Sequence, residues 1–247
     1  MFKGLMAGLG FGGATVRLMV PGVQFRQGEP VLGRIVVEGG GTPQKADQIY
    51  LHLNITSQYE DHSGRLCYLD CAFDTLKINM PLEITGESFR AEVPFVYKVP
   101  LNCPLSRGGT GFELAAGLDV KDAINPCDRL AVKILPCIQV EAVLNALDKL
   151  KFRHRGNSGD FNGKLQQFVF SPTIFMYGQI DELALTFRVY NGSVAAAINI
   201  TCKNNRQHFS LKWPDGFLVT GGKPNTDIVK TALKEFLRTA YDSLSKS

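Results

Sequence analysis

The first residues that could carry chemistry are three glycines near the N-terminus. Gly8, Gly10 and Gly13 have the G-x-G-x-x-G spacing of a loop that binds the pyrophosphate of a dinucleotide. Such a loop needs a buried strand before it and a helix after it, with the helix N-terminus facing the phosphates. Here a β-like segment and a Pro21-Gly22 turn follow the last glycine. The pattern predicts a small-residue N-terminal turn and not a nucleotide site.

The six cysteines could supply metal ligands or a nucleophile. Cys67 and Cys71 share one face of an expected strand, where four residues span about 13 Å. This separation is too long for a disulfide or for two ligands of one zinc ion. The other four cysteines are isolated in the sequence: Cys103, Cys127, Cys137 and Cys202. We expect all six to be buried small apolar side chains, and we expect no metal and no cofactor.

The histidines offer acid–base chemistry but show no catalytic spacing. They are His52, His62, His154 and His208, and none belongs to an H-x-x-x-H or H-E-x-x-H pattern. Cys–His partners can meet in space without being close in sequence. A hydrolase-like or thiol enzyme with a site built from distant Cys, His and Asp residues therefore stays an alternative. Clustering of Cys103 or Cys127 with a histidine in a pocket would favour it.

Two charged clusters have structural explanations. Asp119, Asp122 and Asp128 lie near Asn125, and their spacing indicates a turn held by side-chain bonds to the backbone rather than a calcium loop. A basic cluster surrounds Phe152 and consists of Lys149, Lys151, Arg153, His154 and Arg155. We interpret it as cationic charge at the C-terminus of a helix, where the helix dipole favours it.

The composition limits the partners and the compartment. The net charge of +4 is too small to indicate a nucleic-acid partner. No apolar stretch approaches the roughly 18 residues of a membrane span, so no integral membrane segment is expected. Glycines break the apolar run at the N-terminus, which makes it a poor secretion signal. We expect a cytoplasmic protein whose cysteines are thiols.

The elements that must position these residues are mostly strands. In the segment QIYLHLNITSQY, apolar side chains alternate with polar ones, and ESFRAEVPFVYKV repeats the pattern. Strands of this kind bury one face and expose the other, as in an antiparallel sandwich. No helix alternates with them, which argues against a parallel α/β sheet. In the second half, Asn191-Gly192 joins two further strands and predicts a tight hairpin.

Two amphipathic helices interrupt the strands. Apolar residues at three- and four-residue spacing predict one helix in IQVEAVLNALDKLKF, followed by a polar linker. A second apolar stripe predicts a terminal helix over 226–245, capped by Asn225 or Thr226. We expect a first β-sandwich domain over 1–137, a connecting helix and linker over 138–156, and a smaller β domain over 157–247.

Several phrases of the sequence resemble one bacterial family. They are GEPVLGRIVVEGG, QIYLHLNITSQYED, ELAAGLDVKDAINPCDRLAV, VEAVLNALDKLKFRHR, QQFVFSPT and DELALTFR. In this order they resemble the sporulation-control family named for the stage-zero M protein, over about residues 12 to 190. Lys151 stands where the family usually has glycine. The resemblance implies arrestin-like β-sandwich domains that act as adaptors or regulators, with no catalytic residue or cofactor to carry over.

These observations predict a mainly β, arrestin-like protein that is not an enzyme and acts by binding other proteins. Binding would use strand addition at a sheet edge or docking of the terminal helix. The candidate interaction residues are Leu233, Phe236, Leu237 and Trp213. The helix could instead cover its own sheet, or pair two copies as a homodimer. A carrier of a small molecule or lipid is a further alternative, and it would need a large apolar cavity.

Overall fold

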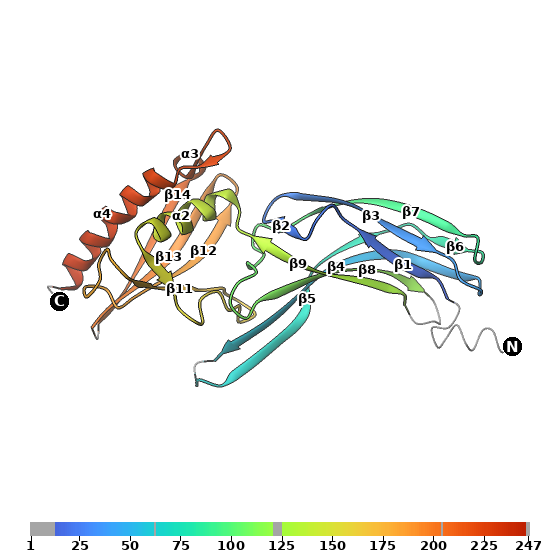
Figure 1. Ribbon diagram of the computed structural model, residues 1–247, viewed down its shortest axis with the longest axis horizontal. Helices are drawn as coiled ribbons and strands as arrows, with labels where there is room; N and C mark the ends of the chain where they lie inside the picture. Colours follow the sequence, from blue (N-terminus) through green and yellow to red (C-terminus); the bar gives the residue numbers. More distant parts are fainter. Residues whose placement is uncertain (1–12, 62, 121–124, 204, 246–247) are drawn as a thin grey trace. The chain divides into compact units, whose positions relative to one another are not determined.

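The computed structural model describes residues 13–61, 63–120, 125–203 and 205–245 (Figure 1). The N-terminal glycine motif lies outside this range except for Gly13, as do His62 and Asp122. Within the described residues, no helix combines the length and the apolar character needed to cross a membrane. The chain divides into two compact units, which are described separately.

The first unit comprises Met1–Thr56, Asp70–Pro100 and Gly111–Lys133. One antiparallel sheet has the order β1-β3-β7, formed by Thr15–Met19, Pro30–Glu38 and Arg90–Lys98. The larger sheet has the order β2-β9-β8-β4-β5, with β6 also paired to β4. Its strands are β2 (Gln24–Arg26), β4 (Gln44–Glu60), β5 (Leu66–Ile78), β6 (Leu82–Ile84), β8 (Gly111–Val120) and β9 (Cys127–Leu135).

The core of the first unit follows the alternation read from the sequence. The apolar residues of β4 are fully buried: Ile49, Leu51, Leu53 and Ile55. In the smaller sheet, Gly33 lies opposite Phe95. A Cβ atom on Gly33 would come within 2.4 Å of the Phe95 ring, so the glycine leaves the space that this ring fills.

The second unit comprises Ser57–Leu69, Leu101–Thr110 and Ile134–Ser247. Its antiparallel sheet has the order β10-β11-β12-β13-β14. The strands are β10 (Phe152–His154), β11 (Phe168–Pro172), β12 (Glu182–Tyr190), β13 (Ser193–Cys202) and β14 (Asn205–Pro214). The remaining elements are α2 (Ile138–Lys149), α3 (Asp215–Leu218), β15 (Val219–Thr220), β16 (Lys223–Pro224) and α4 (Thr226–Leu244).

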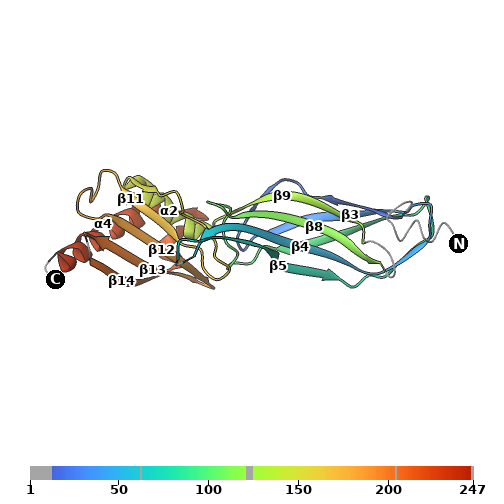
Figure 2. The same cartoon turned by 90° about the horizontal axis from the view of Figure 1, so that it is seen from below.

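Helices α2 and α4 pack against each other and lie on the same face of this sheet (Figures 1 and 2). The apolar stripe of α4 and the inward side chains of β12 and β13 are buried together in this unit. The predicted Asn-Gly hairpin is confirmed, since Tyr190 pairs with Ser193 and Gly192 has a φ of 84°. Burial of the α4 stripe closes the core on the helix side.

The predicted fold class and the C-terminal helix are confirmed, with α4 beginning at Thr226. Asn225 occupies the N-cap position, but its side chain makes no capping bond. Its amide nitrogen instead donates to the carbonyl of Phe217 and to the hydroxyl of Thr220. The expected domain boundaries at 137 and 157 stay a prediction; in the compact units, α2 belongs with the second sheet.

Candidate functional site

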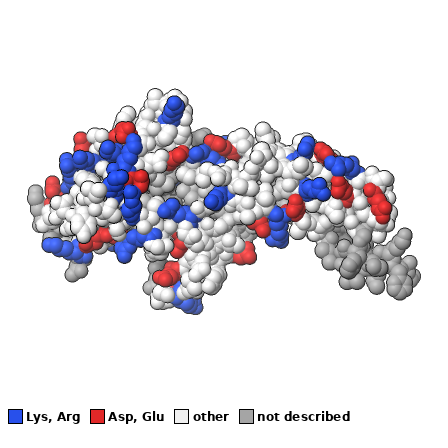
Figure 3. Space-filling model, in the orientation of Figure 1, with Lys and Arg blue, Asp and Glu red and all other residues white. Residues whose placement is uncertain are grey.

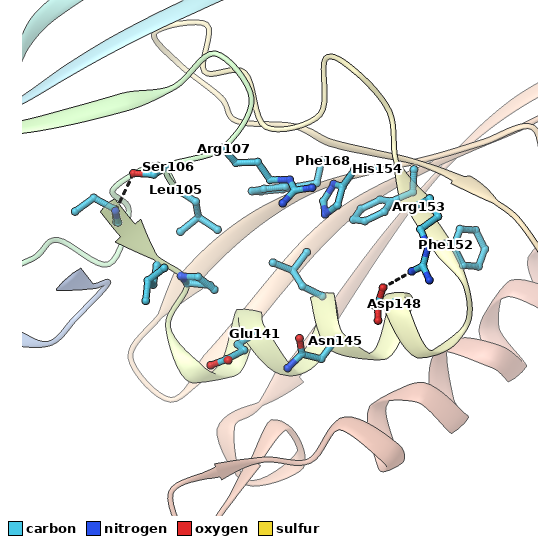
Figure 4. Close-up of a pocket in the computed structure, with 15 residues that line it drawn as sticks. Leu105, Ser106, Arg107, Glu141, Asn145, Asp148, Phe152, Arg153, His154 and Phe168 are labelled. Carbon is cyan, nitrogen blue, oxygen red and sulfur yellow. Dashed lines mark hydrogen bonds and ion pairs between the residues drawn. The ribbon is translucent and has the colours of Figure 1, made fainter. Parts of the chain in front are cut away.

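A groove of about 680 Å³ lies within the second unit, between α2 and the edge of the sheet (Figure 4). Its lining comes from segments 105–107 and 134–136, from α2, and from strands β10 and β11. Two hydrogen bonds between Ser106 and Ile134 bring the first two segments together, and α2 then connects segment 134–136 to β10. A volume of this size accommodates a small molecule or a few side chains of a bound segment.

The base of the groove is apolar and aromatic. Phe152, Phe168 and Phe170 are each no more than 3% exposed and come from β10 and β11. The ring of His154 stacks at a tilt on Phe170, with 4.2 Å between the ring centroids. Since so little of these rings is exposed, the apolar surface open to a ligand comes more from the half-buried Leu135 and Leu144, which also line the groove.

His154 is held in place by a buried serine. Its Nδ1 lies 2.6 Å from Oγ of Ser158, and the same Oγ accepts a hydrogen bond from the backbone N–H of Val169 at 2.9 Å. Ser158 is only 3% exposed, so its hydroxyl serves the structure and is not presented to a ligand. Burial, with a smaller effect from the nearby Arg107, lowers the pKa of His154 to about 4. The imidazole is therefore neutral at physiological pH.

Two arginines line the groove and differ in their pairing. Arg153 forms an ion pair with Asp148 on α2. Arg107 lies beside His154 and Phe168 in Figure 4. Within the described residues, no ion pair joins Arg107 to a carboxylate, and partial burial lowers the pKa of its guanidinium. Arg107 is thus a largely solvent-accessible cation without a carboxylate partner, placed to receive an anionic group from a ligand.

The edge of β10 borders this groove. The carbonyl of Lys151 accepts the N–H of Thr173, the residue just after β11, and the N–H of Arg155 donates to the carbonyl of Val169 in β11. Backbone groups alternate in direction along an antiparallel strand, so the N–H and C=O groups of the intervening Phe152 and His154 point away from β11. Among the described strands, none pairs with this edge of β10. The groove therefore combines an apolar base, a cation and unpaired strand backbone.

Comparison with known families identifies the family to which a chain with this fold belongs. A family model described as SpoOM protein matches residues 2–204, which is most of the chain. The chain belongs to the Spo0M family. The sporulation-control protein Spo0M of Bacillus subtilis is 31% identical over 202 residues, covering 75% of this chain and 74% of that protein. This confirms the family predicted from the sequence.

The crystal structure of B. subtilis Spo0M shares the fold. Its TM-score with this chain is 0.78 at 20% sequence identity, covering 94% of this chain and 100% of that chain. The likeness extends beyond residue 204, where the family-model match ends. This Spo0M family member is accordingly mostly antiparallel β, with few helices.

The interaction residues predicted for this Spo0M family member lie at the α4–sheet interface. Leu233 and Leu237 are 2% and 1% exposed, and Trp213 is also buried. Phe236 packs edge-on against Phe209 of β14, with 5.3 Å between the ring centroids. The burial of Leu233, Leu237 and Trp213 favours the alternative that α4 covers its own sheet. A role of these four residues in binding a partner stays a prediction.

The expectation that all cysteines are buried is wrong for three of them. Cys103, Cys137 and Cys202 are buried, whereas Cys71 and Cys127 are exposed and Cys67 is intermediate. Cys67 and Cys71 lie on β5, an edge strand that is largely exposed on both faces. Neither Cys103 nor Cys127 lines the groove around His154. Among the residues described, no three His, Cys, Asp or Glu side chains gather as a metal site would require.

The charged clusters behave largely as expected. Oδ1 of Asn125 accepts the N–H of Val120 and Oδ1 of Asp128 accepts the N–H of Arg129, which are local bonds of the predicted kind. Oδ2 of Asp128 instead accepts the N–H of Leu18 on the distant strand β1. In the basic cluster, Lys149 pairs with Asp227 and Arg155 with Glu182. Arg153 and His154 stand out in the sequence as part of this cluster, but the sequence does not indicate that they line a groove. The groove also depends on Arg107, and no local pattern singles out this residue, because it lies in a Gly-rich loop with no charged neighbour in the sequence.

Proposed function

We propose that this Spo0M family member is a non-enzymatic regulatory adaptor that binds an extended segment of another protein along β10. The observation that carries the proposal is the unpaired edge of β10 bordering the groove. A segment added to this edge would form main-chain hydrogen bonds with Phe152 and His154. Alternate side chains of the same segment would then enter the groove, because side chains of a strand alternate in direction.

The lining of the groove indicates the chemistry of that segment. The half-buried Leu135 and Leu144 favour an apolar side chain, and Arg107 favours a carboxylate beside it. The preferred segment is therefore extended, with an apolar residue close to an Asp, a Glu or a C-terminal carboxylate. Helix α4 has no part in this binding mode, because its apolar stripe is already buried. We place the activity in the cytoplasm, where the six thiols would stay reduced.

The decisive experiment compares His154→Pro with His154→Ala. Proline at position 154 removes the N–H that points away from β11 and leaves the hydrogen bonds that Lys151 and Arg155 make. Alanine removes the same imidazole but keeps the N–H. Strand addition predicts that a bound partner is lost with His154→Pro and retained, at reduced affinity, with His154→Ala.

The partner would first be captured by a photo-crosslinking residue at Asn145, which is exposed on α2 and lines the groove. Mass spectrometry would identify the cross-linked segment, and its synthetic peptide would be titrated against the full-length variants. Equal affinities of the proline and alanine variants would contradict strand addition. A captured small molecule in place of a peptide would favour the carrier alternative.

A further inference from the structure

A turn that follows β11 presents two large apolar side chains to solvent. Ile174 is 70% exposed and Tyr177 is 74% exposed. The turn itself is held firmly, since the side chain of Met176 is buried and the N–H of Ile180 donates to the Met176 carbonyl at 3.0 Å. Thr173 fixes its start through two hydrogen bonds to the carbonyl of Lys151. The two exposed side chains are therefore displayed by an ordered backbone.

Basic residues of α4 lie next to this turn. The Nζ atom of Lys234 and the Cζ atom of Arg238 each lie 5.7 Å from the centroid of the Phe175 ring, which belongs to the turn. Lys230 precedes Lys234 by one helical turn and shares its flank of α4. Figure 3 shows Lys and Arg side chains gathered over the region of α2 and α4. In the described part of the chain, no ion pair joins these three cations to a carboxylate.

Exposed apolar side chains next to cations suit only a few kinds of binding partner. Two apolar side chains are too small an area for a stable protein interface, which needs about 800 Å² from each partner. A lipid bilayer makes no such demand, because each apolar side chain that enters the interface contributes separately. Tyrosine favours the headgroup level of a membrane, and the long stems of Lys and Arg let their charges reach anionic headgroups.

We propose that Ile174, Tyr177, Lys230, Lys234 and Arg238 form a surface that docks onto anionic phospholipids of a bilayer. We call it the turn–α4 surface. Ile174 and Tyr177 enter the interface, while the three cations bind phosphate groups of the lipids. The proposal is independent of the groove, because the two sets of residues do not overlap.

The test is sedimentation of the full-length protein with vesicles. One set contains phosphatidylcholine alone, and the other contains about a third phosphatidylglycerol, an anionic lipid. We expect binding to the anionic vesicles only, and we expect high salt to weaken it because salt screens the attraction. Absence of binding to the anionic vesicles, or equal binding to both sets, would overturn the proposal.

Variants then test the named residues. Lys234→Gln combined with Arg238→Gln should weaken binding about 25-fold, since each basic residue near an anionic surface contributes about fivefold. Ile174→Ser combined with Tyr177→Ser should weaken it at least tenfold. The matched control is Ile228→Ser, which changes an exposed aliphatic residue on a different flank of α4. Circular dichroism would verify that each variant is folded.

Two results of the variant series would contradict the turn–α4 surface. Wild-type binding by the Ile174 and Tyr177 double variant would show that the turn does not enter the bilayer. An equal loss in the Ile228→Ser control would show that the effect is not specific to this surface. Binding lost in both double variants and kept in the control supports the proposal.

Discussion

His154 shows how one residue couples the groove to the stability of the second unit. Its imidazole is buried against Phe170 and bonded to Ser158, with Arg107 nearby. Burial and the nearby charge of Arg107 favour an uncharged ring, and the side chain therefore acts as a packed, hydrogen-bonded wall of the groove rather than as a cation. A protonated His154 would disturb the site that the proposed partner segment uses.

The first prediction concerns pH. The pKa of His154 is about 4 in the folded protein and near 6.5 when unperturbed, so between these values the unfolded chain binds a proton that the folded protein does not. Acidification from pH 7 to pH 4.5 should cost about 1–2 kcal/mol of stability through this residue, after allowance for its partial exposure. His154→Asn, which keeps a polar group beside Ser158, should lose less stability over the same range.

Two measurements check this expectation. Nuclear magnetic resonance titration of the His154 ring should show a midpoint near pH 4. Arg107→Gln should raise that midpoint, because it removes a nearby positive charge. A wild-type midpoint near 6.5 would contradict the described burial of the ring.

At the residue scale, the sequence indicated which residue types gather near His154 in the chain, but it did not indicate which distant residues lie beside it in the fold. Arg153 and His154 belong to a cluster that stands out in the sequence, and the end of a helix was correctly placed beside it. The groove also requires Arg107 and Phe168, which are 47 and 14 residues away from His154. Nothing in local spacing reports that such residues meet, since the meeting depends on how α2 packs.

At the scale of elements, α4 is the clearest case of a pattern with two possible meanings. An apolar stripe on a terminal helix suits a core or a partner equally well, so periodicity alone could not decide between them. The burial of Leu233 and Leu237 places the stripe inside the second unit. The polar flanks of the helix are what remains on the surface, and the turn–α4 surface uses one of them.

The second prediction tests this packing. Leu233→Ala should destabilise the second unit by about 2–5 kcal/mol, because it leaves a cavity in a buried interface. Ile228→Ala changes the exposed side of the same helix and should stay within about 0.5 kcal/mol of wild type. Urea denaturation followed by circular dichroism measures both values. Similar effects of the two changes would show that the stripe is not packed as described.

At the scale of the whole molecule, two compact units each have their own buried core. The alternation in β4 allowed the first core to be predicted from the sequence. The segments Ser57–Leu69 and Leu101–Thr110, by contrast, belong to the second unit although they lie among strands of the first. The unit that a segment joins depends on contacts between residues far apart in the sequence, and composition does not indicate those contacts.

The third prediction follows from the two cores. Leu53→Ala and Leu233→Ala remove buried side chains from different units and should lower different thermal transitions in scanning calorimetry. Each variant should leave the other transition close to its wild-type temperature. If both changes lower a single common transition, the units unfold together.

The shortness of β10 has a kinetic consequence. The strand has three residues, and only Phe152 and His154 direct backbone groups away from β11, toward its unpaired edge. Two residues supply at most two donors and two acceptors, so a bound segment gains few main-chain bonds and dissociates quickly. An edge this short also gives little template for runaway pairing between copies of the chain. A partner bound at this edge would therefore form a transient complex, as signalling proteins do, and not a permanent one.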